Sequence, residues 1–153
     1  MAVESWIDAL CKRWGAVGDG KGAFVRSYVV YERREFPEAL DGSVPSAITY
    51  TTECRPIYSQ GQSIDLWNGV TEFHLAPNVS RAHYPDIMRY FARIRDAAAG
   101  TIGLDGLVAE FMIRNDIAGM LGPVRLRYGE EAEHLGIVVN WKVKEVVTVT
   151  VGA

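Results

Sequence analysis

Hydrophobic and polar side chains alternate over two stretches near the middle of the chain, 48–55 and 67–75. A period of two places successive side chains on opposite faces of an extended backbone, so both stretches predict β-strands. The intervening segment 59–63 is rich in turn-forming residues, and together the three segments predict an antiparallel hairpin. In the second stretch Trp67, Thr71, Phe73 and Leu75 face one way, and Glu72 and His74 face the other.

Three more alternating stretches follow, at 107–114, 123–129 and 135–151. In the first two, charged side chains separate the apolar positions, and we expect strands whose apolar faces cover a core. The third keeps one parity apolar over almost its whole length. This apolar parity comprises Ile137, Val139, Trp141, Val143, Val147, Val149 and Val151.

The last stretch is nearly three times the usual strand length of about 5 to 6 residues. At about 3.3 Å per residue it would reach roughly 55 Å, longer than a domain of this size is wide. Two alternatives follow: the strand bends at Glu145, or its end leaves the body and pairs with a neighbouring chain. Because a long apolar edge needs a cover, we expect self-association through this strand.

Apolar positions three and four residues apart predict two helices. The first begins at Ser5, with Asp8 three residues on, and ends at Gly15, where a left-handed glycine commonly closes a helix. The second spans 85–100, with Pro85 in its first turn and Gly100 at its end. Their apolar faces comprise Trp6, Ile7, Leu10 and Trp14 in the first, and Ile87, Met88, Phe91, Ile94 and Ala98 in the second.

Segment 15–22, Gly-Ala-Val-Gly-Asp-Gly-Lys-Gly, resembles the phosphate loop of nucleotide-binding proteins. A phosphate loop follows a strand and opens a helix, whereas this segment closes one, and Gly22 offers no hydroxyl for Mg²⁺. We therefore interpret it as a connector. Residues 24–31 fit a strand or a helix, and the proline-punctuated segment 34–47 predicts a further connector.

The 153 residues allow one compact domain, and 48% hydrophobic with 23% charged residues is typical of a folded globular protein. A net charge of −3 disfavours a dedicated nucleic-acid binder. The first residues carry acids and no long apolar run, and no stretch approaches the roughly 18 apolar residues of a membrane span. We expect a soluble protein made in a cytoplasm, with no membrane partner.

The residues that carry chemistry form no recognised catalytic or metal-binding pattern. Cys11 and Cys54 stand far apart and are expected to be small core residues. His74, His83 and His134 match no metal-ligand spacing, and no serine or cysteine lies in a nucleophile motif. We therefore expect no enzyme activity, no metal and no cofactor.

Several segments taken in order carry a resemblance. The helix SWIDALCKRW leads into an extended region with Tyr, Pro, Leu and Pro landmarks, and then comes the strand WNGVTEFHLAP. The helix YPDIMRYFARIRDAA follows, and RLRYGEEAEHLGIVVNWKVKEVV closes the series with a Tyr-Gly turn before a Trp-containing strand. In order and character, over nearly the whole chain, these segments resemble the tail terminator (tail-completion) proteins of long-tailed bacteriophages and gene transfer agents. Two features depart from that family: segment 15–22 is longer than expected, and the final TVTVGA extends the last strand.

The resemblance implies one α+β domain over residues 1–153, with a mixed, mostly antiparallel sheet flanked by the two helices. It implies a structural virion protein, assembled in the host cytoplasm, that forms a six-membered ring. Such a ring caps the head-proximal end of the tail tube, stops its polymerisation and offers a docking face to the head connector. The implied partners are further copies, the tail tube protein and connector or neck proteins, with incidental contact to DNA in the lumen.

A closed ring joins two different, complementary patches on each subunit. We expect the C-terminal strand to supply one patch and the second helix the other, and a solvated face is the alternative for the helix arginines. The predicted interface residues are Trp141, Val143, Val147 and Val149 on the strand, and Arg89 and Arg93 on the helix.

Two alternatives to a tail terminator stay open. The first is another neck or head–tail joining protein of the same virion, with a similar fold and a different docking face. The second is a small α+β ligand-binding or enzymatic domain with a pocket near His74 and His134. Stabilisation by a metal or metabolite would support the second.

Overall fold

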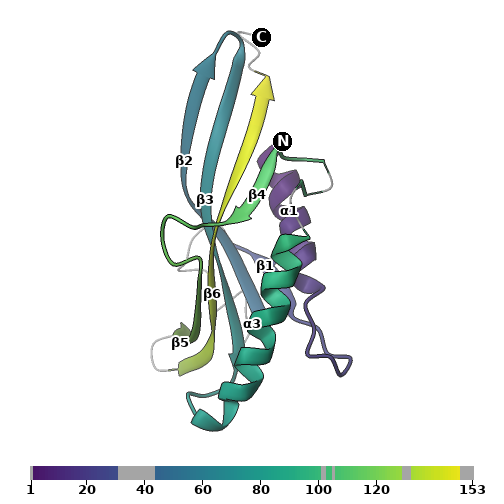
Figure 1. Ribbon diagram of the computed structural model, residues 1–153, viewed down its shortest axis with the longest axis vertical. Helices are drawn as coiled ribbons and strands as arrows, with labels where there is room; N and C mark the ends of the chain where they lie inside the picture. Colours follow the sequence, from purple (N-terminus) through teal and green to yellow (C-terminus); the bar gives the residue numbers. More distant parts are fainter. Residues whose placement is uncertain (1, 31–43, 101–102, 105, 129–131, 149–153) are drawn as a thin grey trace.

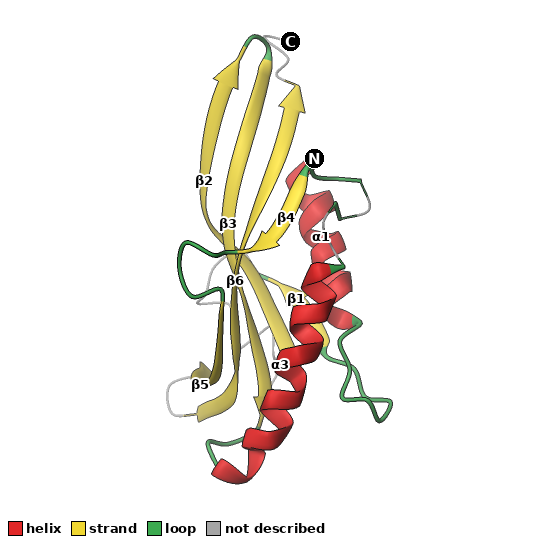
Figure 2. Ribbon diagram, in the orientation of Figure 1, coloured by secondary structure: helices red, strands yellow, loops and turns green. Residues whose placement is uncertain are grey.

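The computed structural model of the chain describes residues 2–30, 44–100, 103–104, 106–128 and 132–148. Within these ranges two α-helices pack on one face of a single six-stranded sheet, as Figures 1 and 2 show. The elements are α1 (Ala2–Gly15), β1 (Arg26–Val29), β2 (Ser46–Ser59), β3 (Gln62–Ala76), the 3-10 turn η2 (Arg81–His83), α3 (Tyr84–Ala99), β4 (Glu110–Ile113), β5 (Met120–Tyr128) and β6 (Ala132–Thr148).

The sheet has the order β1-β2-β3-β6, and both β4 and β5 pair with the far edge of β6. Only the β1–β2 pair is parallel among the described strands, and the other pairs are antiparallel. The mixed, mostly antiparallel sheet with an N-terminal and a central helix confirms the predicted α+β class. Residues 24–31, left open by the sequence, contain the strand β1 rather than a helix.

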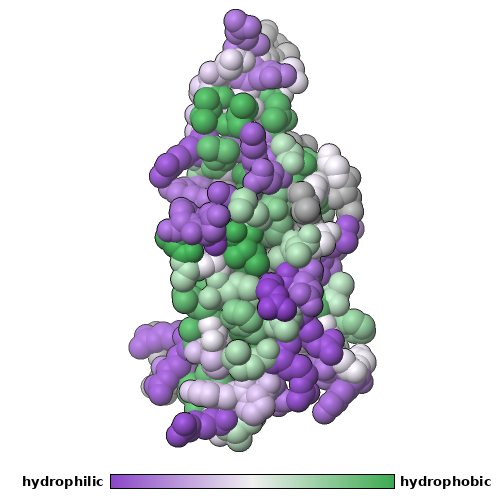
Figure 3. Space-filling model, in the orientation of Figure 1, coloured by the Kyte–Doolittle hydropathy of each residue, from purple (hydrophilic) through white to green (hydrophobic). Residues whose placement is uncertain are grey.

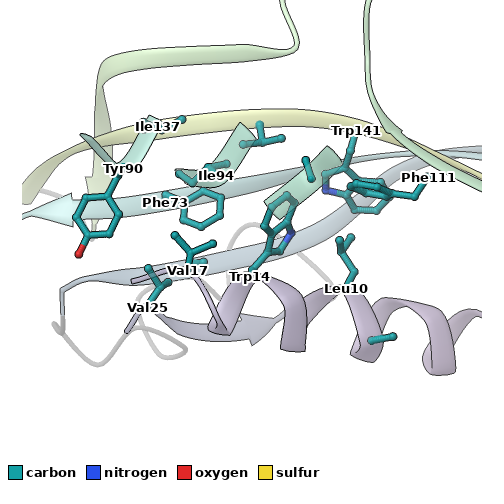
Figure 4. Packing of buried hydrophobic residues seen from close by; sticks show 14 of the residues in the cluster. Leu10, Trp14, Val17, Val25, Phe73, Tyr90, Ile94, Phe111, Ile137 and Trp141 are labelled. Atoms are coloured by element: carbon teal, nitrogen blue, oxygen red, sulfur yellow. The ribbon is translucent and has the colours of Figure 1, made fainter. Parts of the chain in front are cut away.

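The core lies between the two helices and the sheet face that they cover (Figure 4). Aromatic rings hold its centre: Trp14 meets Phe73 edge-on at 5.4 Å between ring centroids, and Trp6 meets Trp141 edge-on at 5.8 Å. Offset and edge-to-face contacts of this kind add to the stabilisation from buried area. The largest fully buried side chains are Trp6, Trp14, Trp141, Phe73, Phe111, Leu10, Ile48, Ile87, Ile94 and Leu104.

The C-terminal strand neither bends at Glu145 nor leaves the sheet within its described length. β6 runs unbroken for 17 residues, and its residues from Leu135 to Thr148 pair with β3 of the same chain. This is geometrically allowed because β2 and β3 are nearly as long, at 14 and 15 residues. The three strands continue together as an arm whose base is covered by α1 and whose tip projects past the helices (Figure 1). We call residues 53–68 of β2 and β3 with residues 142–148 of β6 the arm.

The boundaries of the first helix differ from prediction. α1 begins at Ala2 rather than at Ser5, so Ser5 lies inside the helix and is not its cap. Gly15 is its last residue, as predicted, but its backbone is not left-handed.

Burial also differs from prediction at several places. In α3 the buried stripe contains Tyr90 in place of Met88, whose side chain is 50% exposed. The predicted strand 107–114 begins only at Glu110, because residues 106–109 form a turn that exposes Leu107. Cys11 and Cys54 are half-buried rather than core residues.

Candidate functional site

The predicted interface residues of the C-terminal strand that the structure describes lie at two different depths. Trp141 and Val143 are buried in the core of the protomer, with 0% and 2% of their surface exposed. Val147 is half-buried near the end of the arm, and Val149 lies outside the described residues. The side chains of Trp141 and Val143 therefore stabilise the subunit itself, and a contact through this strand would involve the part of the arm beyond them.

The predicted helix residues Arg89 and Arg93 both lie on the exposed side of α3. The guanidinium of Arg89 is 3.4 Å from the Asp86 carboxylate and its side chain is about half exposed. Arg93 lies against Gly20 of the segment between α1 and β1. Together with Asp19, the two arginines line a shallow polar hollow of about 200 Å³.

The phosphate-loop-like segment folds around the Asp19 side chain. The carboxylate of Asp19 accepts hydrogen bonds from the backbone N–H groups of Lys21, at 2.7 Å, and Ala23, at 3.2 Å. These donors lower the pKa of Asp19. Gly18 and Phe24 close the turn with an isolated β-bridge. The segment is a self-contained turn, as the connector interpretation expects.

A buried polar network occupies the sheet face opposite the helices. The Tyr50 hydroxyl donates to Glu72 Oε2 at 2.7 Å, and Glu72 Oε1 lies 3.3 Å from His74 Nε2. His74 Nδ1 is 3.0 Å from His134 Nδ1. Glu72 and His74 are therefore buried, although their polar parity on β3 would suit a solvated face.

The two histidine rings of this network are joined by one N–H···N hydrogen bond. Between the two Nδ1 atoms of His74 and His134 only one hydrogen fits, so one ring donates and the other accepts. Burial lowers the pKa of His134 and favours its neutral form, and the neighbouring His74 adds a smaller lowering. Neither histidine lines the cavities of about 360, 200 and 390 Å³ among the described residues. The network therefore joins β3 to β6 through side chains in addition to the backbone ladder.

The sequence placed Glu72 and His74 on one face of a strand and offered a pocket near His74 and His134 as an alternative. The structure brings the two histidines into contact although they are 60 residues apart. No group of three or more histidine, cysteine or acidic side chains that could hold a metal occurs among the described residues.

The outer face of the arm carries a charged groove of about 360 Å³. In one cross-strand row Arg55, Leu66 and Lys144 follow one another over β2, β3 and β6. The neighbouring row contains Asn68 and Lys142 in register. Four cationic and two acidic side chains contribute to the lining, which comprises Arg55, Leu66, Trp67, Asn68, Glu110, Arg114, Asp116, Lys142, Val143 and Lys144.

The segment after β4 forms one wall of this groove. Arg114 clamps Asp116 with two hydrogen bonds of 3.0 and 2.6 Å, and this lowers the pKa of Asp116 to about 2. The Asn140 side chain donates to the carbonyl of Ala118 at 2.9 Å and fixes the segment to β6. Among the described residues, neither Lys142 nor Lys144 takes part in an ion pair.

The inner side of the arm buries a carboxylate. Glu145 is 3% exposed and lies beside the indoles of Trp6 and Trp67. Its Oε2 atom and both indole Nε1 atoms lack a hydrogen bond of ordinary geometry. Burial raises the pKa of Glu145, the Trp67 indole opposes this, and the Asp65 carboxylate opposite it in register adds to the rise.

The chain matches no model of a known protein family, and no curated protein is similar enough to count as a relative. Among the described helices, none has the length and apolar character needed to cross a membrane.

Proposed function

We propose that this protein is a structural subunit that self-assembles, and that its assembly is a tail-terminator ring of about six copies. The ring would cap the head-proximal end of a bacteriophage tail tube, stop its polymerisation and dock to the head connector. The observation that carries the proposal is the arm, which takes three paired strands beyond the core of the subunit (Figure 2).

The arm favours assembly because it exposes apolar side chains that another subunit can bury. Its outer part exposes large side chains, with Ile57 at 52%, Tyr58 at 73% and Val146 at 49%. A cluster of exposed apolar side chains commonly marks a surface that binds another protein. In addition, the edge of β2 beyond β1 and the edge of β6 beyond β4 have no strand beside them among the described residues.

The fold agrees with what the resemblance implies, namely a mixed sheet with an N-terminal and a central helix. Ring closure requires two different patches on each subunit. The arm supplies one, and the exposed side of α3 with Arg89 and Arg93 supplies the other. These patches lie on different elements, as a head-to-tail contact requires.

Deletion of residues 146–153 tests the role of the arm. It removes the part of β6 that pairs with Gln62, Ser63 and Ile64, while the core residues of β6 remain. We expect the deleted chain to form fewer or smaller oligomers and to keep its fold, measured by light scattering and by circular dichroism. Undiminished assembly of the deleted chain would contradict the role given to the arm.

A further inference from the structure

We propose that the charged groove on the outer face of the arm is a binding site for an acidic, extended polypeptide segment of another protein. The inference concerns a site and a ligand chemistry that ring assembly does not require. It rests on the groove lined by Arg55, Lys142, Lys144 and Arg114.

The cations of the groove are placed for an external partner. Lys142 and Lys144 are on the same face of β6; Lys144 lies in the row that contains Leu66, and Lys142 lies in the neighbouring row beside Asn68. Arg55 is 75% exposed and is 3.9 Å from Glu53, a separation at which an exposed pair contributes little. These ammonium and guanidinium groups are therefore available to carboxylates of a ligand.

The charge balance is unusual for this chain. The whole chain carries −3, whereas the groove has four cationic and two acidic side chains in its lining. The cationic character is thus local, and the remainder of the chain is more acidic than the whole. Complementary potentials of this kind steer a partner to one face and fix its register.

The groove also has an aliphatic part. Leu66 in its lining is 37% exposed. The apolar row of Ile57, Ile64 and Val146 lies farther out on the arm, outside this lining and in the part assigned to assembly. The space-filling view shows apolar surface along the arm (Figure 3). A ligand that places carboxylates over the lysines can therefore lay an aliphatic side chain on Leu66.

These features favour a polypeptide over a nucleic acid. Glu110 and Asp116 stand among the cations of the groove, and a phosphate backbone offers these carboxylates no hydrogen-bond donor. The same carboxylates can accept N–H groups of a peptide. The groove is lined by cations, carboxylates and aliphatic carbon. An acidic peptide offers a partner to each of them: carboxylates, backbone N–H groups and aliphatic side chains.

A fluorescein-labelled peptide of glutamates interrupted by leucines is a suitable probe. The comparison ligands are the same peptide with lysine in place of glutamate, and a short oligothymidylate. Fluorescence anisotropy is measured with the full chain at low salt, because screening weakens surface charge contacts. We expect the acidic peptide to bind, and the other two to bind at least tenfold more weakly.

The variant Lys142→Glu with Lys144→Glu tests the site. We expect it to lose at least tenfold in affinity for the acidic peptide, because like charges then face each other. The milder Lys142→Gln with Lys144→Gln should lose less and guards against a folding defect. The matched control, Lys12→Glu with Arg125→Glu, makes the same change of charge at exposed positions away from the groove and should leave affinity unchanged.

Each opposite result overturns the inference. No binding of the acidic peptide, an equal loss in the control variant, or tighter binding of oligothymidylate would each exclude an acidic-peptide site in this groove. The outcome is separable from that of ring assembly, since subunits that form rings and ignore the peptide refute only the groove. Subunits that bind the peptide and stay monomeric refute only the ring.

Discussion

At the scale of single residues, Gly69 and Trp141 explain how β3 and β6 pack closely under the helices. The two residues are opposite each other in register, and the Trp141 indole occupies the space where a side chain at position 69 would lie. The indole Nε1 donates to Thr71 Oγ1 at 3.1 Å, so the ring is fixed at both ends. A glycine in the middle of a strand here serves close packing rather than a turn.

The variant Gly69→Ala should destabilise the fold by about 1–3 kcal/mol, because the new methyl group overlaps the Trp141 ring. Urea denaturation followed by tryptophan fluorescence measures the change. The control is Gly15→Ala, where the nearest atom to a new Cβ would be 3.7 Å away and the backbone is not left-handed. Equal stability of the two variants would mean that Trp141 does not pack as described.

The buried carboxylate of Glu145 costs stability at neutral pH. A carboxyl whose pKa is raised on folding favours the folded state below its unfolded pKa, and this stabilisation is lost as the pH rises through the folded pKa. Glu145→Gln removes the charge and keeps an acceptor beside the indoles. We therefore expect Glu145→Gln to stabilise the protein by about 1 kcal/mol near pH 7.

The gain should shrink as the pH falls through the folded pKa of Glu145 and vanish below about 4, where the carboxyl becomes protonated in both states. Thermal melting at several pH values measures it. The exposed Glu110→Gln is the matched control, with an expected change within about 0.5 kcal/mol. A stability of Glu145→Gln that is lower than wild type near pH 7 would show that the ionised carboxylate stabilises the arm.

At the scale of the elements, periodicity predicted the helices and most strands because one face of each is buried in a common core. α3 ends at Gly100 and has Pro85 in its first turn, as the sequence indicates. The hairpin of β2 and β3 forms around Gln60 and Gly61, both with left-handed backbone, in the predicted turn. Such local signals are strong because they depend on neighbouring residues alone.

The features that the sequence left open depend on distant contacts. β1 is a strand because β2 pairs with it in parallel, a contact that its own pattern does not encode. Polar Glu72 and His74 are buried because Tyr50 and His134, from other strands, satisfy them. Sequence periodicity measures polarity and cannot distinguish solvent from a buried polar partner.

The candidate surfaces were predictable only in part for the same reason. The sequence drew attention to the long final strand and to the arginines of α3. The groove, however, combines Arg55 with Lys142 and Lys144, which only the register of β2, β3 and β6 brings together. The burial of Trp141 likewise depends on α1, whose Trp6 covers it.

On the scale of the whole molecule, the arm and α3 are two separate surfaces, and a ring needs both. Reversing Arg89 and Arg93 to glutamate should weaken assembly, because it inverts the charge of the exposed side of α3. The control on the same helix is Arg95→Glu, which makes one of the two charge reversals at an exposed position where Arg95 lies 3.5 Å from its own neighbour Asp96.

Sedimentation velocity of these variants, compared with wild type, measures the effect. We expect at least a tenfold higher concentration for half-assembly in the double variant, the size expected for loss of a few charge contacts in an interface. Assembly that is unchanged in the double variant would remove α3 from the interface and leave the arm as the sole assigned patch.

The most direct test of the account is the mass of the wild-type protein, measured by light scattering over a concentration series with negative-stain images of the largest species. Self-assembly through two patches that close into a ring predicts a mass near six times 17.0 kDa and ring-shaped particles. A species of 17.0 kDa at every concentration, with no rings in the images, would contradict the proposal that this subunit assembles by itself.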